Sequence, residues 1–207
     1  MAGPAAADIA ITKSSAVQGA NVLFNSGVQT GAAVTGHTQG GVIVDFSGST
    51  VGGGNVIRAN GGQARIEGAL NTSTPAKNDT LLLSSLSFAL ADGSTFNNVE
   101  FNLFGGNATG VNFAVTDNLG AIFNFSSVFG NGAEKFAFVG TGGQSIRSIS
   151  LSLVGGGIED VRQIRLDQVV AGVVPEPATW ALMILGFGAI GGALRRTKKP
   201  RTIVRFA

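Results

Sequence analysis

Apolar and polar residues alternate with a period of two along much of the first 170 residues of this chain. Leu86, Phe88 and Leu90, for example, are separated by single small residues. Successive side chains of a β-strand point to opposite faces, so this pattern predicts strands with one face in a core and the other in water. Similar patterns predict strands within residues 8–12, 21–24, 41–46, 99–103, 111–115, 121–125, 135–139, 149–153 and 161–170.

Turn signals separate these strands. Asn60-Gly61 fits a type I′ turn, which needs positive φ at both central residues, and predicts a hairpin between strands near Val56 and Ile66. Residues 117–120 predict a second hairpin. About ten short strands, with no convincing helix before residue 178, favour a mainly β fold.

We predict an antiparallel β-sandwich, jelly-roll-like in topology, followed by one C-terminal transmembrane helix. Phenylalanine supplies nearly all of the aromatic bulk, with 14 residues against one tryptophan and no tyrosine. The core is therefore expected to rest on Phe101, Phe113, Phe123, Phe125 and Phe138.

The composition excludes several classes of function. The chain has no cysteine and one histidine, which excludes thiolate catalysis, disulfides and the common zinc sites. Up to Val174 there are 8 basic and 11 acidic residues, a net charge of −3, and the basic excess follows Leu194. A mildly acidic domain argues against nucleic-acid binding. No metal and no other cofactor is expected.

The C-terminal segment has the order of features of an export and anchoring signal. Pro175-Glu176-Pro177 precedes an apolar run of 17 residues at 178–194, and Arg195 and Arg196 follow at once as a transmembrane stop. At about 1.5 Å per residue, a helix over this run reaches roughly 25 Å, just enough for a thin bilayer. Basic clusters stay on the cytoplasmic side, so the β-rich part is expected outside.

This segment resembles the PEP-CTERM sorting signal, in its PEPxxWA variant, of exported proteins from Gram-negative bacteria. The residues that match the motif are Pro175, Glu176, Pro177, Trp180 and Ala181. The resemblance implies that exosortase, a membrane-embedded transpeptidase-like enzyme, reads the motif and cuts near it. It implies transient anchoring in the lipid of the inner membrane, followed by delivery to the cell surface or the extracellular space.

One feature departs from the resemblance, and one alternative stays open. Such signals usually stop soon after the arginines, whereas this chain continues with TKKPRTIVRFA. An ordinary single-pass tail anchor is the alternative interpretation of the same segment.

At the other end of the sequence, Ala5-Ala6-Ala7 before Asp8 resembles the end of a cleaved signal peptide. The expected division is residues 1–7 (signal-peptide end or disordered), 8–170 (outer domain), 171–177 (linker and motif), 178–194 (transmembrane helix) and 195–207 (cytoplasmic tail).

The predicted hairpin near residue 60 gathers polar side chains that would suit a glycan or an acidic polymer. This candidate ligand face consists of Arg58, Asn60, Gln63, Arg65 and Glu67. An exposed hairpin with alternating charge and no ligand is the favoured interpretation.

Other candidate sites have weaker signals. Glu67 and Glu100 would be the carboxylates of a glycosidase, but solvated charges on strand faces are favoured. His37 lies in the loop-like stretch TGHTQGG and no serine stands in a GxSxG elbow, so a surface histidine is favoured. Calcium ligands are conceivable at Asp117-Asn118 and at Glu159-Asp160, although no DxDxDG spacing is present.

The sequence thus predicts a non-enzymatic, exported surface or extracellular-matrix protein. Its expected partners are exosortase, membrane lipid and exopolysaccharide, the last through the role of such proteins in biofilm assembly. The alternative is a lectin-like, carbohydrate-binding module at the cell surface.

Overall fold

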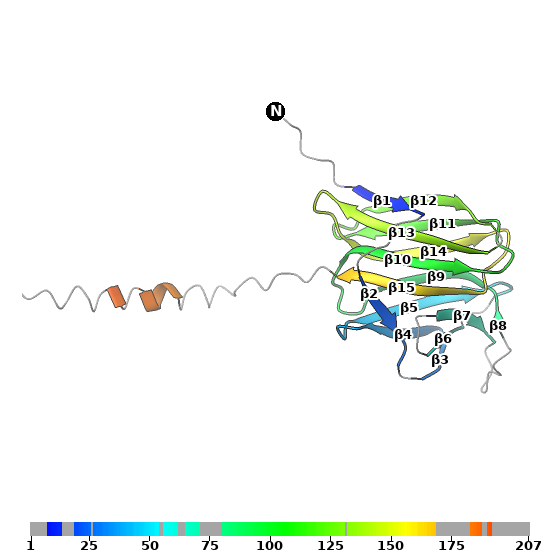
Figure 1. Cartoon of the computed structure of the whole chain (residues 1–207), viewed down its shortest axis with the longest axis horizontal. Helices are drawn as coiled ribbons and strands as arrows, with labels where there is room; N and C mark the ends of the chain where they lie inside the picture. The colour runs from blue at the N-terminus through cyan, green and yellow to red at the C-terminus, as the bar shows by residue number, and fades with distance from the viewer. Residues whose placement is uncertain are drawn as a thin grey trace, which may run out of the picture. The chain divides into compact units, whose positions relative to one another are not determined.

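The part of the chain that the computed structural model describes contains fifteen strands, and every pairing between them is antiparallel (Figure 1). The structure describes residues 8–13, 19–25, 27–53, 56–61, 65–70, 80–130, 132–168, 183–187 and 190–191. The strands are β1 (Asp8–Thr12), β2 (Ala20–Leu23), β3 (Gln29–Gly31), β4 (Ala33–Thr38), β5 (Ile43–Thr50), β6 (Ile57–Asn60), β7 (Arg65–Ala69), β8 (Thr80–Leu81), β9 (Leu83–Leu90), β10 (Phe96–Phe104), β11 (Gly110–Asp117), β12 (Ile122–Val128), β13 (Ala133–Thr141), β14 (Ile146–Val154) and β15 (Asp160–Gln168).

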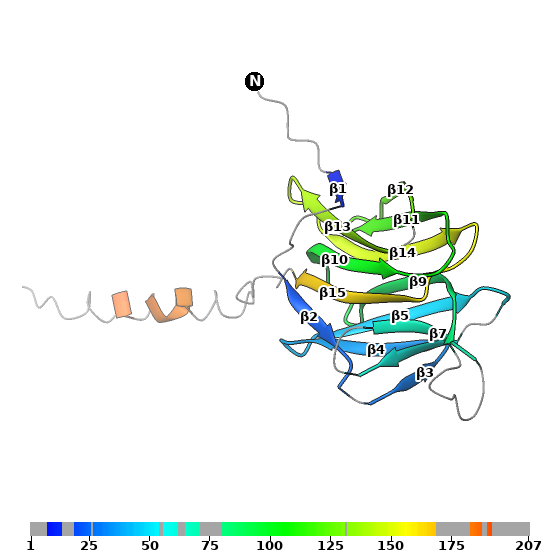
Figure 2. The ribbon, with the colours of Figure 1, turned by 45° about the vertical axis from the view of Figure 1, so that its right-hand side comes forward.

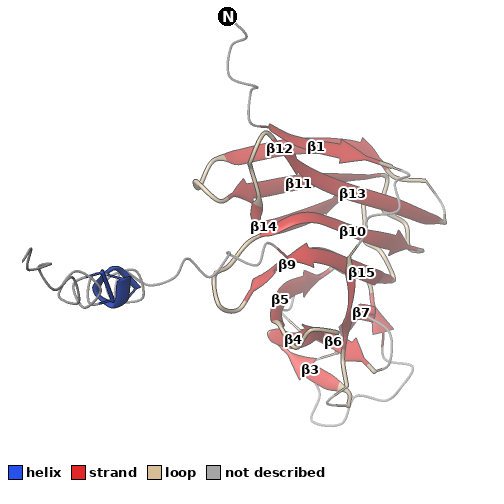
Figure 3. Ribbon diagram, turned by 60° about the vertical axis from the view of Figure 1, so that its left-hand side comes forward, coloured by secondary structure: helices blue, strands red, loops and turns tan. Residues whose placement is uncertain are grey.

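The strands form two layers that face each other. One layer has the order β12-β11-β14-β9-β5-β4, and the other has the order β1-β13-β10-β15-β7-β6-β3. Strand β2 pairs with both β4 and β15, so it joins the two layers along one side. In Figure 3 the first layer runs down one side of the domain and β1, β13, β10 and β15 run down the other. The predicted mainly β, antiparallel fold is confirmed.

The core lies between the two layers and is lined by phenylalanine rings. Phe88 of β9 meets Phe101 of β10 edge to face at 5.7 Å between centroids. Phe113 of β11 lies 4.9 Å from Phe136 and 5.0 Å from Phe138, both on β13. These contacts cross from one layer to the other, which is why apolar residues had to alternate on strands of both layers.

The predicted core residues are placed in the core with one difference. Phe101, Phe113 and Phe138 are buried, as predicted. Phe123 and Phe125 of β12 pack against the core but are only half-buried, because β12 is an edge strand.

Residues 29–38 form two strands, β3 and β4, that the sequence did not predict. The glycine that suggested a loop there has a packing reason. A Cβ on Gly36 would lie 2.7 Å from Val22 Cγ1 and 2.9 Å from Phe24 Cε1. The expected loop position of His37 is wrong: it lies in β4, half-buried, and its Nε2 is 3.2 Å from the Asn25 amide nitrogen.

The chain divides into two units, residues 1–169 and 170–207. In the second unit, residues 183–187 and 190–191 are helical. No helix within the described residues is long and apolar enough to cross a membrane. The predicted linker at 171–177, the basic tail at 195–207 and most of the run at 178–194 lie outside the described residues.

Candidate functional site

A chain of ion pairs crosses the outer surface of the layer that contains β7 and β15. Arg58 Nε of β6 donates to Glu67 Oε1 of β7 at 2.7 Å. Arg65 lies between two carboxylates, with Nη2 3.2 Å from Glu67 Oε2 and Nε 3.1 Å from Asp160 Oδ2. Arg162 of β15 closes the chain with two hydrogen bonds of 2.6 Å to Asp160. We call these five residues the charged face.

The strand register explains why the arginines are needed. Glu67 and Asp160 are direct partners across β7 and β15, and like charges in that position repel each other. Arg65 bridges them, and the hydrogen bonds that Arg162 donates to Asp160 raise the pKa of Arg162. The Arg162 guanidinium also lies 3.7 Å from the centroid of the Phe104 ring. Every carboxylate of the charged face therefore already has a cationic partner.

This geometry changes the interpretation of the candidate ligand face. Arg58 and Glu67 are 4% and 2% exposed, so the expectation of an exposed hairpin is wrong for these two side chains. They form a buried ion pair within the sheet. Arg65 remains partly accessible, Asn60 is half-buried, and Gln63 lies outside the described residues. The hairpin itself is present, because β6 and β7 pair as the sequence predicted. The predicted type I′ turn at Asn60-Gly61 is wrong, because Asn60 lies in β6 opposite Arg65 and neither Asn60 nor Gly61 has a positive φ.

Glu100 was also expected to be a solvated strand-face charge, and this is wrong. It lies on β10, between β13 and β15, and is 2% exposed. Lys135 Nζ from β13 is 3.0 Å from its Oε1. Glu67 and Glu100 lie on β7 and β10, which are separated by β15. Long neighbouring side chains have covered both carboxylates, a consequence that the alternation pattern does not reveal.

Asp117, a candidate calcium ligand, closes the hairpin between β11 and β12. Its Oδ1 accepts the backbone N–H groups of Leu119 at 2.9 Å and Ala121 at 2.7 Å, and Gln144 Nε2 donates to Oδ2. Burial by itself would raise the pKa of Asp117, but these hydrogen bonds, led by the one from Ala121, outweigh it and lower the pKa. Both oxygens are thus engaged, Oδ1 by the turn itself and Oδ2 by Gln144 from the connection between β13 and β14.

The second candidate calcium pair is divided by the strand. Asp160 is fully buried and held by Arg162, whereas its neighbour Glu159 is exposed. Within the described ranges, no group of three or more acidic, histidine or cysteine side chains is arranged to hold a metal ion.

The outer surface of the other layer differs in chemistry. Serines at outward positions follow one another across three strands, since Ser150 of β14 is the partner of Ser87 of β9, and Ser87 is the partner of Ser47 of β5. The next row pairs Ser152 with Ser85 and Ser85 with Ser49. We call these six serines the serine face. Their hydroxyls interact across strands, with Ser49 Oγ 2.7 Å from Ser85 Oγ and a contact between Ser87 and Ser150.

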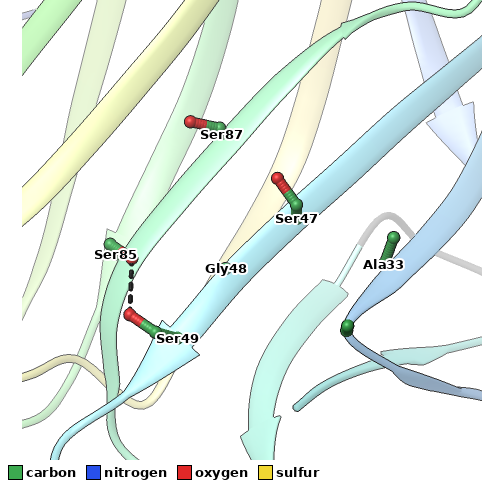
Figure 4. A pocket seen from close by; sticks show the side chains of 7 residues that line it. Ala33, Ser47, Gly48, Ser49, Ser85 and Ser87 are labelled. Atoms are coloured by element: carbon green, nitrogen blue, oxygen red, sulfur yellow. Dashed lines mark hydrogen bonds between the residues drawn. The ribbon is translucent and has the colours of Figure 1, made fainter. Parts of the chain in front are cut away.

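An open hollow of about 500 Å³ lies on the serine face (Figure 4). It is lined by Ala32, Ala33, Ser47, Gly48, Ser49, Ser85 and Ser87. Figure 4 shows the serines of β5 and β9 side by side around it. Because a hydroxyl both donates and accepts, this neutral surface suits a ligand rich in hydroxyl groups. The alternation along β9 and β14 predicted these strands, but none of their serines was among the predicted site residues.

The family model for the PEP-CTERM protein-sorting motif matches residues 173–199 of this chain. The matched segment contains the predicted motif residues Pro175, Glu176, Pro177, Trp180 and Ala181 and the arginines Arg195 and Arg196, all outside the described residues. No curated protein and no solved structure matches the chain. The motif marks the chain as an exported protein that exosortase targets and that is anchored transiently in a membrane.

Proposed function

We propose that this protein is a structural component of the cell surface or extracellular matrix, which exosortase processes and which associates with exopolysaccharide in a biofilm. The observation that carries this proposal is the sorting motif at residues 173–199. The motif supports export and processing by exosortase. The β domain at residues 8–168 is the part that would remain outside after a cut near Pro175.

Intact-mass spectrometry of the protein from its own host, with and without exosortase, tests whether the enzyme removes the C-terminal segment. We expect loss of the segment from about Pro177 onward only when the enzyme is present. A variant with Pro175 and Pro177 both replaced by alanine should keep its full mass in the presence of the enzyme. Recovery of the unchanged chain in the membrane fraction of both strains would make the segment a permanent anchor and overturn the proposal.

We propose further that the β domain is not an enzyme. Glu67, Glu100 and Asp160, three of the carboxylates buried in the described residues, each have a lysine or arginine partner. A glycosidase would need two carboxyl groups free to face a sugar from opposite sides. Incubation of the purified protein with the host's exopolysaccharide should therefore produce no new reducing ends, and their appearance would contradict this part.

The alternative proposal is a carbohydrate-binding module, and the hollow on the serine face favours it. That surface offers neutral hydroxyls without a charged or aromatic side chain among its lining residues. Stacking on pyranose rings is therefore not the mode of binding, and hydrogen bonding would have to supply the affinity. The candidate site moves from the hairpin around Arg58 to β5 and β9.

Co-sedimentation with the host's exopolysaccharide separates the two proposals. Ser85→Leu and Ser87→Leu would fill the hollow, whereas Asn112→Leu on β11 lies on the same layer outside the hollow lining. A binding module should lose most of its sedimentation with the first two variants and keep it with the third. Equal sedimentation of the three variants would contradict the proposal of a binding module and would be consistent with the structural role.

We also propose that the sandwich is a jelly-roll variant. Strands β9, β14, β11 and β12 are neighbours in one layer, while β10 and β13 are neighbours in the other. The chain therefore crosses between layers on each side of β10 and of β13, as a jelly roll requires. A crystal structure in which β13 pairs with β12 in place of β10 would contradict this topology.

A further inference from the structure

Among the described strands, β12 forms a free edge of its layer. Within the described part of the chain it pairs with β11 alone (Figure 2). The edge of a sheet presents a row of unpaired backbone N–H and C=O groups, which is a template for a strand from another molecule.

The hairpin fixes the direction of these groups. The Asp117 amide donates to the Ala121 carbonyl at 2.9 Å, and the Phe129 amide donates to the Thr109 carbonyl at 3.1 Å. Residues of an antiparallel pair that exchange hydrogen bonds alternate with residues that do not. The odd-numbered residues of β12 therefore bond to β11. The backbone groups of the even-numbered residues point away from β11: these are Ile122, Asn124, Ser126 and Val128.

This edge has few of the features that keep exposed strands apart. Natural edge strands use charges, prolines or bulges, whereas β12 reads IFNFSSV and pairs with β11 without a register shift. Its end residues Ile122 and Val128 are apolar and 62% and 78% exposed. Lys13, after β1, donates to the Val128 carbonyl at 3.4 Å, and this covers one end of the edge only.

We propose that β12 pairs antiparallel with β12 of a second copy, across a two-fold axis at Phe125. This register places Ile122 opposite the second copy's Val128, and Asn124 opposite its Ser126. All four residues with outward backbone groups then exchange hydrogen bonds with the second copy, once the exposed Lys13 side chain releases the Val128 carbonyl. On the outer surface, the apolar side chains of Ile122 and Val128 meet each other, and the amide of Asn124 meets the hydroxyl of Ser126.

The inner side of the strand supports the same register. Phe125 is half-buried and lies 5.6 Å from Phe138, at the open side of the core. On the two-fold axis it would face its own copy, so the apolar surface that β12 leaves accessible would be covered. The strand has no charge to repel its copy, and a two-fold interface requires this self-complementarity. These features favour a second copy over an unrelated partner.

Disulfide cross-linking tests the register directly, because the chain contains no cysteine. The full-length protein in detergent micelles is prepared as two single-cysteine variants, Asn124→Cys and Ser126→Cys, with tags of different size. In the proposed register these two positions face each other with Cα atoms about 5.5 Å apart, which suits a disulfide. We expect the mixture to form the mixed disulfide dimer in several-fold higher yield than either variant alone.

The reason for the lower yield is geometric. Two copies of Asn124→Cys would meet only diagonally, with Cα atoms about 7–8 Å apart, too far for a relaxed disulfide. Ser152→Cys, exposed on β14 and away from the edge, is the matched control and should not cross-link with either variant. Equal yields in all combinations would overturn the proposal, and so would a disulfide adduct with a different host protein in place of the homodimer.

Sedimentation in micelles gives an independent readout. Val128→Lys introduces a charge at a position that is already 78% exposed, so the fold should be retained while the dimer dissociates to the monomer. Ser152→Lys adds the same charge to the same layer and should leave the dimer intact. A wild-type protein that sediments as a monomer at high concentration would overturn the proposal.

Discussion

The charged face and the serine face lie on the outer surfaces of opposite layers, and they use their polar residues in different ways. On the charged face, long side chains lie over the carboxylates, so that Glu67 and Asp160 are 2% and 0% exposed. On the serine face, short side chains leave the strands accessible around an open hollow. Both faces result from the same alternation of apolar and polar residues. The length of the outward side chain therefore decides whether a sheet surface is sealed or available to a partner.

This comparison assigns different roles to the two faces. Removal of one partner from a buried network of ion pairs destabilises the folded state, and such a network offers little to a ligand. An open neutral surface, by contrast, tolerates substitution and is free for contact. Substitutions should therefore separate into large effects on stability for the charged face and small ones for the serine face.

The largest loss of stability is expected for Glu67→Ala. The variant removes the carboxylate from the Arg58 guanidinium, whose side chain is only 5% exposed and cannot turn to water in the folded state. Removal of one partner of a buried ion pair costs about 3–5 kcal/mol in the free energy of unfolding. Urea denaturation followed by circular dichroism measures this loss. A change within about 0.5 kcal/mol would show that Glu67 is solvated and would remove the distinction between the faces.

A smaller loss is expected for Asp160→Asn. The variant loses the charge that accepts hydrogen bonds from Arg162 and Arg65, but these arginine side chains are 31% and 44% exposed and can regain water. Loss of charge-assisted hydrogen bonds should lower the free energy of unfolding by about 1.5–3 kcal/mol. The same denaturation assay applies, and Glu159→Gln at the exposed neighbouring position is the control. A greater loss of unfolding free energy than for Glu67→Ala would contradict the argument that the exposed arginines regain water after they lose their partner.

The fold was largely predictable from the sequence, and the sites were not. Period-two alternation identified strands such as β9 and β14, because one-sided burial is written directly into the order of residues. Strand β4 was missed because it runs into the loop-like stretch TGHTQGG, whereas Gly36 in that stretch is explained by the close approach of Val22 and Phe24. That contact joins residues on different strands and has no local signal.

The burial and the ion-pair partners of the charged residues could not be predicted for a related reason. Alternation indicates the side of the sheet to which Glu67 and Glu100 point. It does not indicate that Arg58 of β6 and Arg65 of β7 lie against Glu67, or that Lys135 of β13 lies against Glu100. The hollow on the serine face likewise depends on the register between β4, β5 and β9. The sorting motif is the opposite case, because a processing enzyme reads it as a linear sequence and its recognition needs no tertiary contact.

Asp117 separates the effect of burial from that of a cationic partner. It is fully buried, but the hydrogen bonds that engage its carboxylate come from neutral N–H groups of the turn and from Gln144. Its pKa is lowered from the ordinary value of 3.8, so its contribution to stability is complete above that value and is lost as the pH falls through the lowered pKa. Stability measured from pH 6 to pH 2 should fall less steeply below pH 4 in Asp117→Asn than in the wild type. Parallel curves would show that the turn does not favour the charged form.

The smallest effects on stability are expected on the serine face. Ser47→Ala and Ser152→Ala each remove an exposed hydroxyl and leave the backbone ladder unchanged, so the free energy of unfolding should change by no more than about 0.5 kcal/mol. Thermal unfolding of each variant beside Glu67→Ala gives the comparison in one experiment. A loss comparable to that of Glu67→Ala would mean that the serine hydroxyls hold the layer together. Near-neutral values would leave these serines without a stabilising role, so that six outward hydroxyls on three adjacent strands are best understood as a surface for contact outside the domain.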